Sequence, residues 1–233
     1  MKKGAIFDLD GTLLDSMSIW DRAGELFLEK LGIPAEKDLG QTMFAMSMEE
    51  GAKFLQKQYG LTQDTEEIME GINKTVREFY YYQVELKKGA RNLLDKMKQA
   101  GFTLVAATSS DRNNIEAALR RLEILPCFDR IYTCTEIGVG KDQPDIYLAA
   151  AGFLGLPPAR IWVFEDALHA LETAHRAGFL TAAVYDSWSR KEQEEIQKIC
   201  DIYLTGLDQD QELWSRIRSR IQNGIRKIVS SEL

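Results

Sequence analysis

Short apolar runs alternate along the chain with longer segments in which apolar residues recur at helical spacing. The runs are rich in Val, Ile and Phe, and they predict six strands at residues 5–9, 103–107, 130–133, 161–164, 181–185 and 202–204. Most of them carry no alternating polar face, which is typical of strands covered on both sides in a parallel sheet. Helical spacing between them predicts helices at residues 90–100, 112–122, 145–154 and 168–177. This alternation predicts a doubly wound α/β fold.

Residues 19–85 break this rhythm, because they contain helical patterns at 19–31, 48–59 and 65–82 and no good strand. We interpret them as an all-helical insert after the first strand. The expected division is a core of residues 1–16 and 87–233 and an inserted domain of residues 17–86. A further pattern of apolar residues predicts a terminal helix at 211–229.

Composition narrows the class of protein. The 233 residues are 45% hydrophobic and 28% charged, a balance that excludes a disordered or fibrous chain. The net charge of −7 argues against a general nucleic-acid binder. No apolar stretch reaches the ~18 residues of a membrane helix. Asp8 and Asp10 interrupt the apolar start, so it does not read as a signal peptide.

Cysteine usage indicates the redox environment. The chain has three cysteines and no CxxC pair, so neither a disulfide framework nor a zinc site is expected. We expect reduced thiols in a cytoplasmic protein, with a monomer as the default state.

Two carboxylates, Asp8 and Asp10, come at the end of the first predicted strand. Positions two apart in a strand point to the same side, and the carboxyl edge of a parallel sheet is where open α/β folds bind ligands. A polar loop that happens to hold two acids is the alternative. Adjacent like charges after a buried strand are costly unless a cation or a reaction uses them, so we favour a functional pair.

Thr108 follows the second strand and begins the run Thr108-Ser109-Ser110. A hydroxyl and free backbone amides at a strand-to-helix turn form an anion site. Ser110 or Asp111 capping the next helix is an alternative that is compatible with this role for Thr108.

A lysine and a second acidic pair complete the set of candidate residues. Lys141 stands in a glycine-rich loop, where a lysine taken alone is usually solvated. Glu165 and Asp166 end another buried strand, with a helix N-cap as the alternative role of Asp166. Carboxylates from two strands at one sheet edge repel each other unless a cation joins them, and oxygen ligands of this kind suit Mg²⁺.

The order of these motifs resembles the haloacid dehalogenase superfamily of phosphotransferases over nearly the whole chain. The residues that carry the resemblance are Asp8-Leu9-Asp10-Gly11-Thr12-Leu13, Thr108, Lys141 and Glu165-Asp166. The helical insert is similar to the cap of the subfamily that includes β-phosphoglucomutase and phosphoglycolate phosphatase. The resemblance implies a Rossmann-like core with a small all-helical cap domain inserted after the first strand.

The resemblance also implies roles in phosphoryl transfer. Asp8 would be the nucleophile that forms an aspartyl-phosphate, and Asp10 the general acid and then the general base. Thr108 and the Ser109 amide would hold phosphoryl oxygens. Lys141 would neutralise charge between Asp8 and the phosphate.

The implied cofactor is Mg²⁺. It would bind the Asp8 carboxylate, the backbone carbonyl of Asp10, and the side chains of Glu165 and Asp166. Together with Lys141 it would lower the repulsion between an anionic nucleophile and an anionic phosphate.

The insert departs from the mutase pattern. Trp20 falls about where β-phosphoglucomutases carry a histidine, and the loop at residues 41–48 is apolar and Met-rich instead of carrying Lys-Gly and Arg. We therefore favour hydrolysis of a small phosphorylated metabolite over sugar-phosphate mutase chemistry. Trp20, Phe44 and Met48 are candidates to line the substrate's non-phosphate end, with a place in the insert's own core as the alternative.

Two other classes of protein share parts of this pattern. A signalling receiver domain also uses an aspartate, a hydroxyl and a lysine on a doubly wound sheet. Its acceptor does not lie on the first strand, and it has no place for a long helical insert. A catalytically idle binding protein is disfavoured because every charged group that the reaction needs is present.

Overall fold

The computed structural model describes residues 2–43, 46 and 48–219. The chain divides into two compact units. One contains Met1–Leu13, Leu86–Ser110 and Pro126–Leu233; the other contains Leu14–Glu85 and Asp111–Leu125. This division differs from the expected domains chiefly because the helical unit also takes in residues 111–125. The expected domain boundaries themselves stay a prediction.

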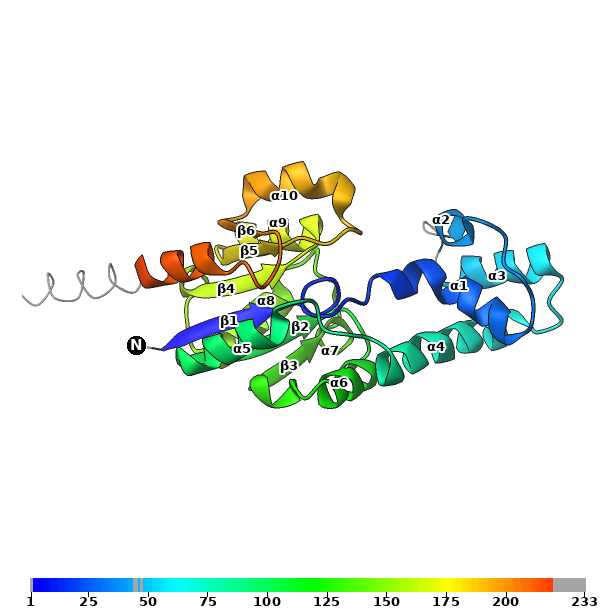
Figure 1. Ribbon diagram of the computed structural model, residues 1–233, viewed down its shortest axis with the longest axis horizontal. Coiled ribbons are helices and arrows are strands. Elements are labelled where there is room, and N and C mark those ends of the chain that lie inside the picture. Colours follow the sequence, from blue (N-terminus) through cyan, green and yellow to red (C-terminus); the bar gives the residue numbers. More distant parts are fainter. Residues whose placement is uncertain (1, 44–45, 47, 220–233) are drawn as a thin grey trace, which may run out of the picture. The chain divides into compact units, whose positions relative to one another are not determined.

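The first unit, which we call the core unit, is built on one parallel sheet of six strands (Figure 1). The strands are β1 (Lys3–Phe7), β2 (Phe102–Thr108), β3 (Arg130–Thr133), β4 (Ile161–Glu165), β5 (Leu180–Val184) and β6 (Ile202–Leu204). Their order across the sheet is β3-β2-β1-β4-β5-β6. From β1 the chain adds strands toward one edge of the sheet, and from β4 it adds them toward the other edge. The carboxyl ends of the two strands at such a switch point form a ligand crevice.

The predicted strands are confirmed, with one shift that matters for the site. β1 begins at Lys3 and ends at Phe7, whereas the pattern predicted residues 5–9. Leu9 is fully buried although it lies beyond the last ladder position, so its apolar character does not mark the strand end. Asp8 is therefore the first residue after the strand instead of part of it.

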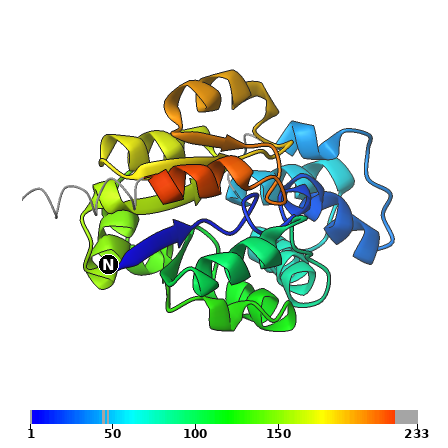
Figure 2. The same ribbon diagram turned by 60° about the vertical axis from the view of Figure 1, so that its left-hand side comes forward.

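Helices lie on both faces of this sheet (Figure 2). They are α5 (Ala90–Gln99), α7 (Cys134–Ile137), α8 (Asp145–Leu154), α9 (Leu168–Arg176) and α10 (Gln193–Ile199), and residues 211–219 are also helical. α8 packs on one face, where Ile146 and Ala150 belong to a buried cluster with Ile6, Val105 and Val163. The short helices α7 and α10 were not predicted. The rest of the predicted terminal helix, residues 220–229, lies outside the described part of the chain.

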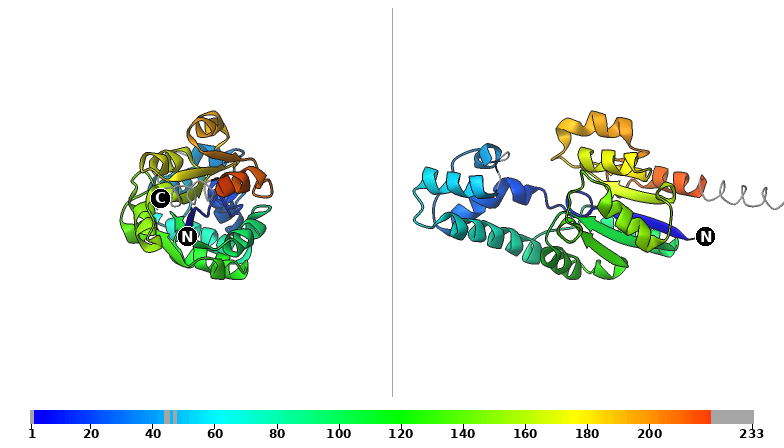
Figure 3. Two further views of the ribbon diagram at one scale, coloured as in Figure 1. Left: turned by 90° about the vertical axis from the view of Figure 1, so that its left-hand side faces the viewer. Right: turned by 180° about the vertical axis from the view of Figure 1, so that it is seen from behind.

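The second unit, the helical unit, contains α1 (Ser18–Lys30), α2 (Leu39–Met43), α3 (Met48–Tyr59), α4 (Thr65–Tyr82) and α6 (Arg112–Arg121). α4 packs against α1, α3 and α6 (Figure 3). It begins at a capping box in which Asp64 accepts from the Glu67 amide and Glu67 accepts from the Asp64 amide. The three long helices of the insert were predicted; α2 was not.

Two further facts bear on the class of protein. Among the described helices, none has both the length and the apolar character that crossing a membrane requires. Cys127, Cys134 and Cys200 are free thiols.

Candidate active site

The predicted acids and Thr108 meet at the carboxyl edge of the central strands. Asp8 directly follows β1, Thr108 is the last residue of β2, and Glu165 is the last residue of β4, followed by Asp166. β1 lies between β2 and β4, and the Asp8 amide donates to the Phe164 carbonyl at 3.0 Å. Thr108 and Glu165, about 100 and 157 positions after Asp8 in the sequence, thus lie on the strands next to it.

The turn after Asp8 is shaped around Asp166. Gly11 has φ +81°, and a Cβ there would collide with the Asp166 carboxylate, so both the backbone conformation and the space require glycine. Thr12, fully buried, donates through Oγ1 to Asp166 Oδ1 at 3.0 Å. The run Gly11-Thr12 therefore orients a carboxylate that directly follows another strand, β4.

Lys141 is buried between two of the acids. Its Nζ donates to Asp8 Oδ1 and, at 2.6 Å, to Glu165 Oε1. Although burial disfavours the charged form, the charges of Asp8 and Glu165 raise the pKa of Lys141 above its usual range. Lys141 is therefore an ammonium ion held in the site, and the interpretation as a solvated loop lysine is wrong.

Asp8 has one oxygen bonded and one oxygen open. Oδ1 accepts from Lys141, whereas Oδ2 is buried and has no hydrogen-bond partner within the described part of the chain. Burial, and next the neighbouring Glu165 carboxylate, raise the pKa of Asp8 to about 7. A buried carboxylate oxygen without a partner is costly, and such atoms in native proteins call for an explanation in function or a bound ion.

Three carboxylates form a cluster that fits a hard cation. Asp8, Glu165 and Asp166 each offer an oxygen, and these atoms lie within 4.8 Å of one another. Burial, and then the charges of Asp8 and Glu165, raise the pKa of Asp166 well above its usual range. Three acids share one ammonium ion, so full ionisation of the cluster would leave an excess of negative charge. An all-oxygen donor set of this kind suits Mg²⁺, whose charge would relieve the repulsion.

The Asp10 side chain is held by two hydroxyl groups. Ser110 Oγ donates to Asp10 Oδ2 at 2.8 Å, and Thr108 Oγ1 donates to the same oxygen at 3.3 Å. Thr108 Oγ1 also accepts from the Ser110 amide at 3.0 Å. The predicted metal contact of Asp10 concerns its backbone carbonyl and stays a prediction.

Sequence reasoning missed the role of Ser110. It offered Ser110 or Asp111 as the cap of the next helix, and the structure gives that role to Asp111, whose carboxylate accepts from the amides of Asn113 and Asn114. Ser109 is exposed, and its hydroxyl contacts Cys134 Sγ at 3.4 Å. The expected contact of the Ser109 amide with phosphate stays a prediction.

The candidate substrate residues of the insert are only partly described. Trp20 is 44% exposed on α1, and Met48 is half-buried at the start of α3. Phe44 lies outside the described residues. The buried core of the helical unit includes Phe27 and Leu55. A substrate role for Trp20, Phe44 and Met48 stays a prediction.

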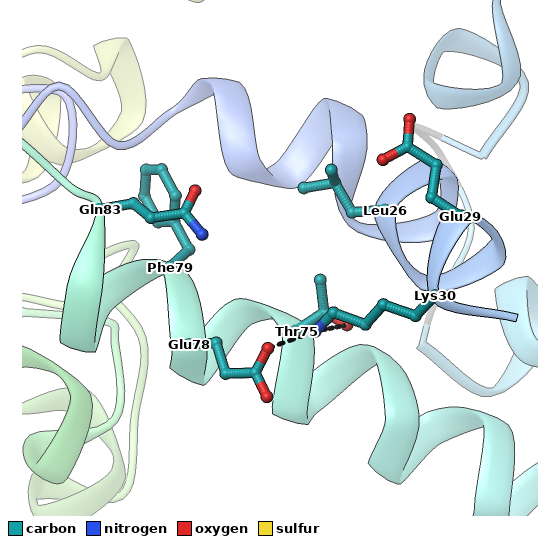
Figure 4. A pocket seen from close by; sticks show the side chains of 7 residues that line it. All are labelled: Leu26, Glu29, Lys30, Thr75, Glu78, Phe79 and Gln83. Atoms are coloured by element: carbon teal, nitrogen blue, oxygen red, sulfur yellow. Dashed lines mark hydrogen bonds and ion pairs between the residues drawn. The ribbon is translucent and has the colours of Figure 1, made fainter. Parts of the chain in front are cut away.

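The helical unit contains a pocket of its own, of about 250 Å³, between α1 and α4 (Figure 4). It is lined by Leu26, Glu29, Lys30, Thr75, Glu78, Phe79 and Gln83. Lys30 donates to Glu78 at 2.5 Å and to Thr75 at 3.1 Å, so its charge is already paired. With Glu29 beside this pair the lining carries net negative charge, which does not favour a phosphate ligand.

Comparison with known proteins agrees with this geometry. The chain is 27% identical over 176 residues to a phosphorylated carbohydrates phosphatase of Thermotoga maritima. The matched region covers 76% of this chain and 82% of that protein. It is 29% identical over 196 residues to a beta-phosphoglucomutase of Bacillus subtilis, with 78% and 83% covered. A solved structure of a beta-phosphoglucomutase candidate from Thermotoga maritima, 23% identical, superposes with a TM-score of 0.82 over 92% of this chain and 99% of that one, which shows a common fold.

A family model describes most of the chain. The model of haloacid dehalogenase-like hydrolases matches residues 2–178, which include Asp8, Asp10, Thr108, Lys141 and the pair Glu165-Asp166. With its parallel sheet and the buried acidic cluster at the carboxyl edge, the chain belongs to the family of haloacid dehalogenase-like hydrolases.

Proposed function

We propose that the protein is a Mg²⁺-dependent phosphomonoester hydrolase that acts on a small phosphorylated metabolite through an aspartyl-phosphate intermediate. One observation carries the proposal. Asp8 is fixed through Oδ1 by a buried ammonium ion and keeps a second, buried oxygen without a hydrogen-bond partner in the described chain. A positioned carboxylate with one open oxygen is what nucleophilic attack on phosphorus needs.

The first step is transfer of the phosphoryl group to Asp8. A carboxylate oxygen of Asp8 bonds to phosphorus while the bond between phosphorus and the ester oxygen breaks. The leaving oxygen takes a proton from the Asp10 carboxyl group, so that an alcohol departs. The Thr108 hydroxyl and the Ser109 amide would bind phosphoryl oxygens, and Lys141 would offset the charge that gathers beside Asp8.

The second step is hydrolysis of the aspartyl-phosphate. Asp10, now a carboxylate, takes a proton from a water molecule whose oxygen bonds to phosphorus. The bond between phosphorus and Asp8 breaks, inorganic phosphate leaves, and the Asp8 carboxylate and the Asp10 carboxyl group are restored. Ser110 and Thr108 keep the Asp10 carboxylate oriented in the structure by their bonds to Oδ2.

Asp8, Glu165, Asp166 and the Asp10 carbonyl would hold Mg²⁺. The bound ion would supply positive charge that stabilises the phosphoryl oxygens. The bonds of Lys141 to Asp8 and Glu165 do not use Asp8 Oδ2, so this oxygen would stay open to the ion while Lys141 keeps both partners.

Phosphatases and a mutase among the relatives both support chemistry on a phosphoryl group. Their names include a phosphorylated carbohydrates phosphatase and a beta-phosphoglucomutase. We favour the hydrolase because Trp20 stands about where the mutases carry a histidine and because the loop at 41–48 lacks their charged residues. A monomer and a cytoplasmic location are also part of the proposal, and the free thiols are in keeping with the latter.

The test uses the full chain with p-nitrophenyl phosphate and a panel of phosphorylated metabolites, and measures released phosphate. We expect turnover with Mg²⁺ and none after EDTA treatment or in Asp8→Asn. A second incubation with β-glucose-1-phosphate and a bisphosphate activator separates the two reactions, since isomerised product indicates the mutase. Substantial phosphate release by Asp8→Asn, or full activity in EDTA, would overturn the proposal.

A further inference from the structure

A tyrosine lies directly behind the acidic cluster. Tyr147, on α8, is fully buried, and its hydroxyl donates to Glu165 Oε1 at 2.9 Å. The same oxygen accepts from Lys141 at 2.6 Å. Neither the motif pattern nor the proposed reaction steps give Tyr147 a role.

The rest of the Tyr147 side chain packs within an apolar cluster. It belongs to the buried cluster that includes Ile6, Val105 and Val163, and its ring centroid lies 6.0 Å from that of Phe179. Within α8, no residue after Asp145 other than Tyr147 carries a side-chain hydrogen-bond donor. A phenylalanine would fill the same space without placing a polar atom there. Packing alone therefore does not account for the hydroxyl, which must be satisfied in the interior.

Both hydrogen bonds to Glu165 go to Oε1, and neither goes to Oε2. The terminal torsion of a glutamate is soft and nearly two-fold, so a buried carboxylate needs external donors to fix its plane. Tyr147 and Lys141 approach Oε1 from two different segments, a helix and a loop, and together they define the orientation of the group. Oε2 is the oxygen free of these two donors, and Glu165 is one of the three acids whose carboxylate oxygens lie within 4.8 Å of one another.

We propose that Tyr147 is a positioning residue that holds the Glu165 carboxylate in the orientation that binds the divalent cation. The inference rests on the proposed function, because it assumes the metal site. The hydroxyl group acts through its bond to the Glu165 carboxylate, which would hold the ion. Hydrogen bonds to metal ligands of this kind change metal affinity by about tenfold to a hundredfold when they are removed.

The experiment is a Mn²⁺ titration of the full-length chain, with free Mn²⁺ followed by electron paramagnetic resonance. The variant Tyr147→Phe keeps the ring and removes the hydroxyl. We expect its dissociation constant for Mn²⁺ to rise by about tenfold to a hundredfold. We also expect the Mg²⁺ concentration for half-maximal phosphatase activity to rise in parallel, with kcat largely restored at saturating Mg²⁺.

A matched control is available at the far edge of the same sheet. Tyr203, on β6, donates to Gln193 Oε1 at 2.7 Å, so Tyr203→Phe also removes a phenol that bonds a side-chain oxygen. We expect Mn²⁺ affinity to stay within twofold of wild type in this variant. Near-ultraviolet circular dichroism and thermal unfolding of both variants report on the fold.

The outcomes separate this inference from the function on which it rests. Wild-type protein that binds Mn²⁺, with Tyr147→Phe binding equally well, would overturn the positioning role and leave the hydrolase intact. A Tyr147→Phe protein without a cooperative unfolding transition would also overturn it, because the hydroxyl would then serve stability. Wild-type protein that binds no Mn²⁺ would overturn the metal site, and the inference with it.

Discussion

Replacing Lys141 with methionine tests whether the acidic cluster is held together by one buried cation. The Lys141 side chain is 5% exposed, and its partners Asp8 and Glu165 are 7% and 1% exposed. Methionine keeps much of the length and apolar surface of the lysine stem but removes the ammonium ion. Two buried carboxylates then face each other and Asp166 without the charge that offset them.

The expected loss of folding stability in Lys141→Met follows from this burial. Breaking a buried ion pair by removing one partner costs about 3–5 kcal/mol, because the other charge stays buried. In a chain of this length about 1 kcal/mol corresponds to a shift of roughly 2–4 °C in the midpoint of thermal unfolding. Lys141→Met should therefore lower the midpoint by about 6–20 °C in metal-free buffer at pH 8.

The loss should depend on pH in a definite direction. Burial and the Glu165 charge raise the pKa of Asp8 to about 7, above its value of about 4 in an unfolded chain. Asp8 in the folded protein therefore takes up its proton as the pH falls through about 7, whereas in the unfolded chain it does so only near pH 4, and a neutral carboxyl group needs no ammonium partner. The difference between wild type and Lys141→Met should be larger at pH 8 than at pH 5.

The assay is thermal and urea unfolding in EDTA, with Lys198→Met as the control. Lys198 pairs with Glu195 at 3.1 Å, but these side chains are 64% and 61% exposed. The same substitution there should cost less than about 1 kcal/mol, as exposed pairs do. If Lys141→Met loses no more stability than Lys198→Met at pH 8, the buried ion pair does not hold the cluster together.

Three further substitutions test separate parts of the mechanism. Asp8→Asn should abolish turnover and raise the metal-free unfolding midpoint at pH 8, because one charge leaves the buried cluster; a midpoint no higher than wild type would contradict the assumed repulsion. Asp10→Asn should slow formation of the phosphoryl-enzyme by about 10²–10⁴-fold and block its discharge, so that a mass increase of one phosphoryl group persists in intact-protein mass spectrometry; rapid steady turnover would refute the acid–base role. Ser110→Ala removes a bond to a charged group that is worth about 1.5–3 kcal/mol, so kcat/KM for an alkyl phosphate should fall by about tenfold to a hundredfold. The loss with p-nitrophenyl phosphate, whose leaving group needs little protonation, should be smaller, and equal losses would show that Ser110 does not act through Asp10.

The fold could be predicted because strands buried on both faces leave a simple signal. All six strands appear as short apolar runs, and the carboxyl ends of parallel strands meet at one edge whatever their separation in sequence. The missed helices are the ones whose signal is weak. α10 buries only Gln193 and Ile196, and α7 is a four-residue turn started by a capping box between Thr133 and Glu136. Their existence depends on tertiary context more than on periodicity.

Site residues could be predicted where a reactive side chain stands at the end of a strand. They could not be predicted where a residue acts by bonding a side chain on another element. Glu165 ends a buried strand, and Asp8 and Asp166 directly follow buried strands, so their convergence follows from topology. Tyr147 lies in an apolar helix and Ser110 in a polar turn, and each pattern has an ordinary structural interpretation. Only the distances to Glu165 and Asp10 separate a bonding partner from a core or capping residue. A single hydroxyl in an otherwise apolar helix just after Lys141 was the available signal for Tyr147.

The donors around the acids follow one rule, which explains why several elements are needed to build the site. In each of the three clustered acids, the donors bond only one of the two carboxylate oxygens. Lys141 bonds Asp8 Oδ1, and Thr12 bonds Asp166 Oδ1. Tyr147 and Lys141 both bond Glu165 Oε1. A carboxylate with donors on both oxygens has fewer lone pairs left for phosphorus or a cation, whereas one with no donor could rotate in its pocket. Fixing one oxygen from behind leaves the other oriented, which is the pre-organisation that catalysis by charge requires. A substitution that removes one of these donors should therefore weaken the site through lost orientation, even where all of its carboxylates remain.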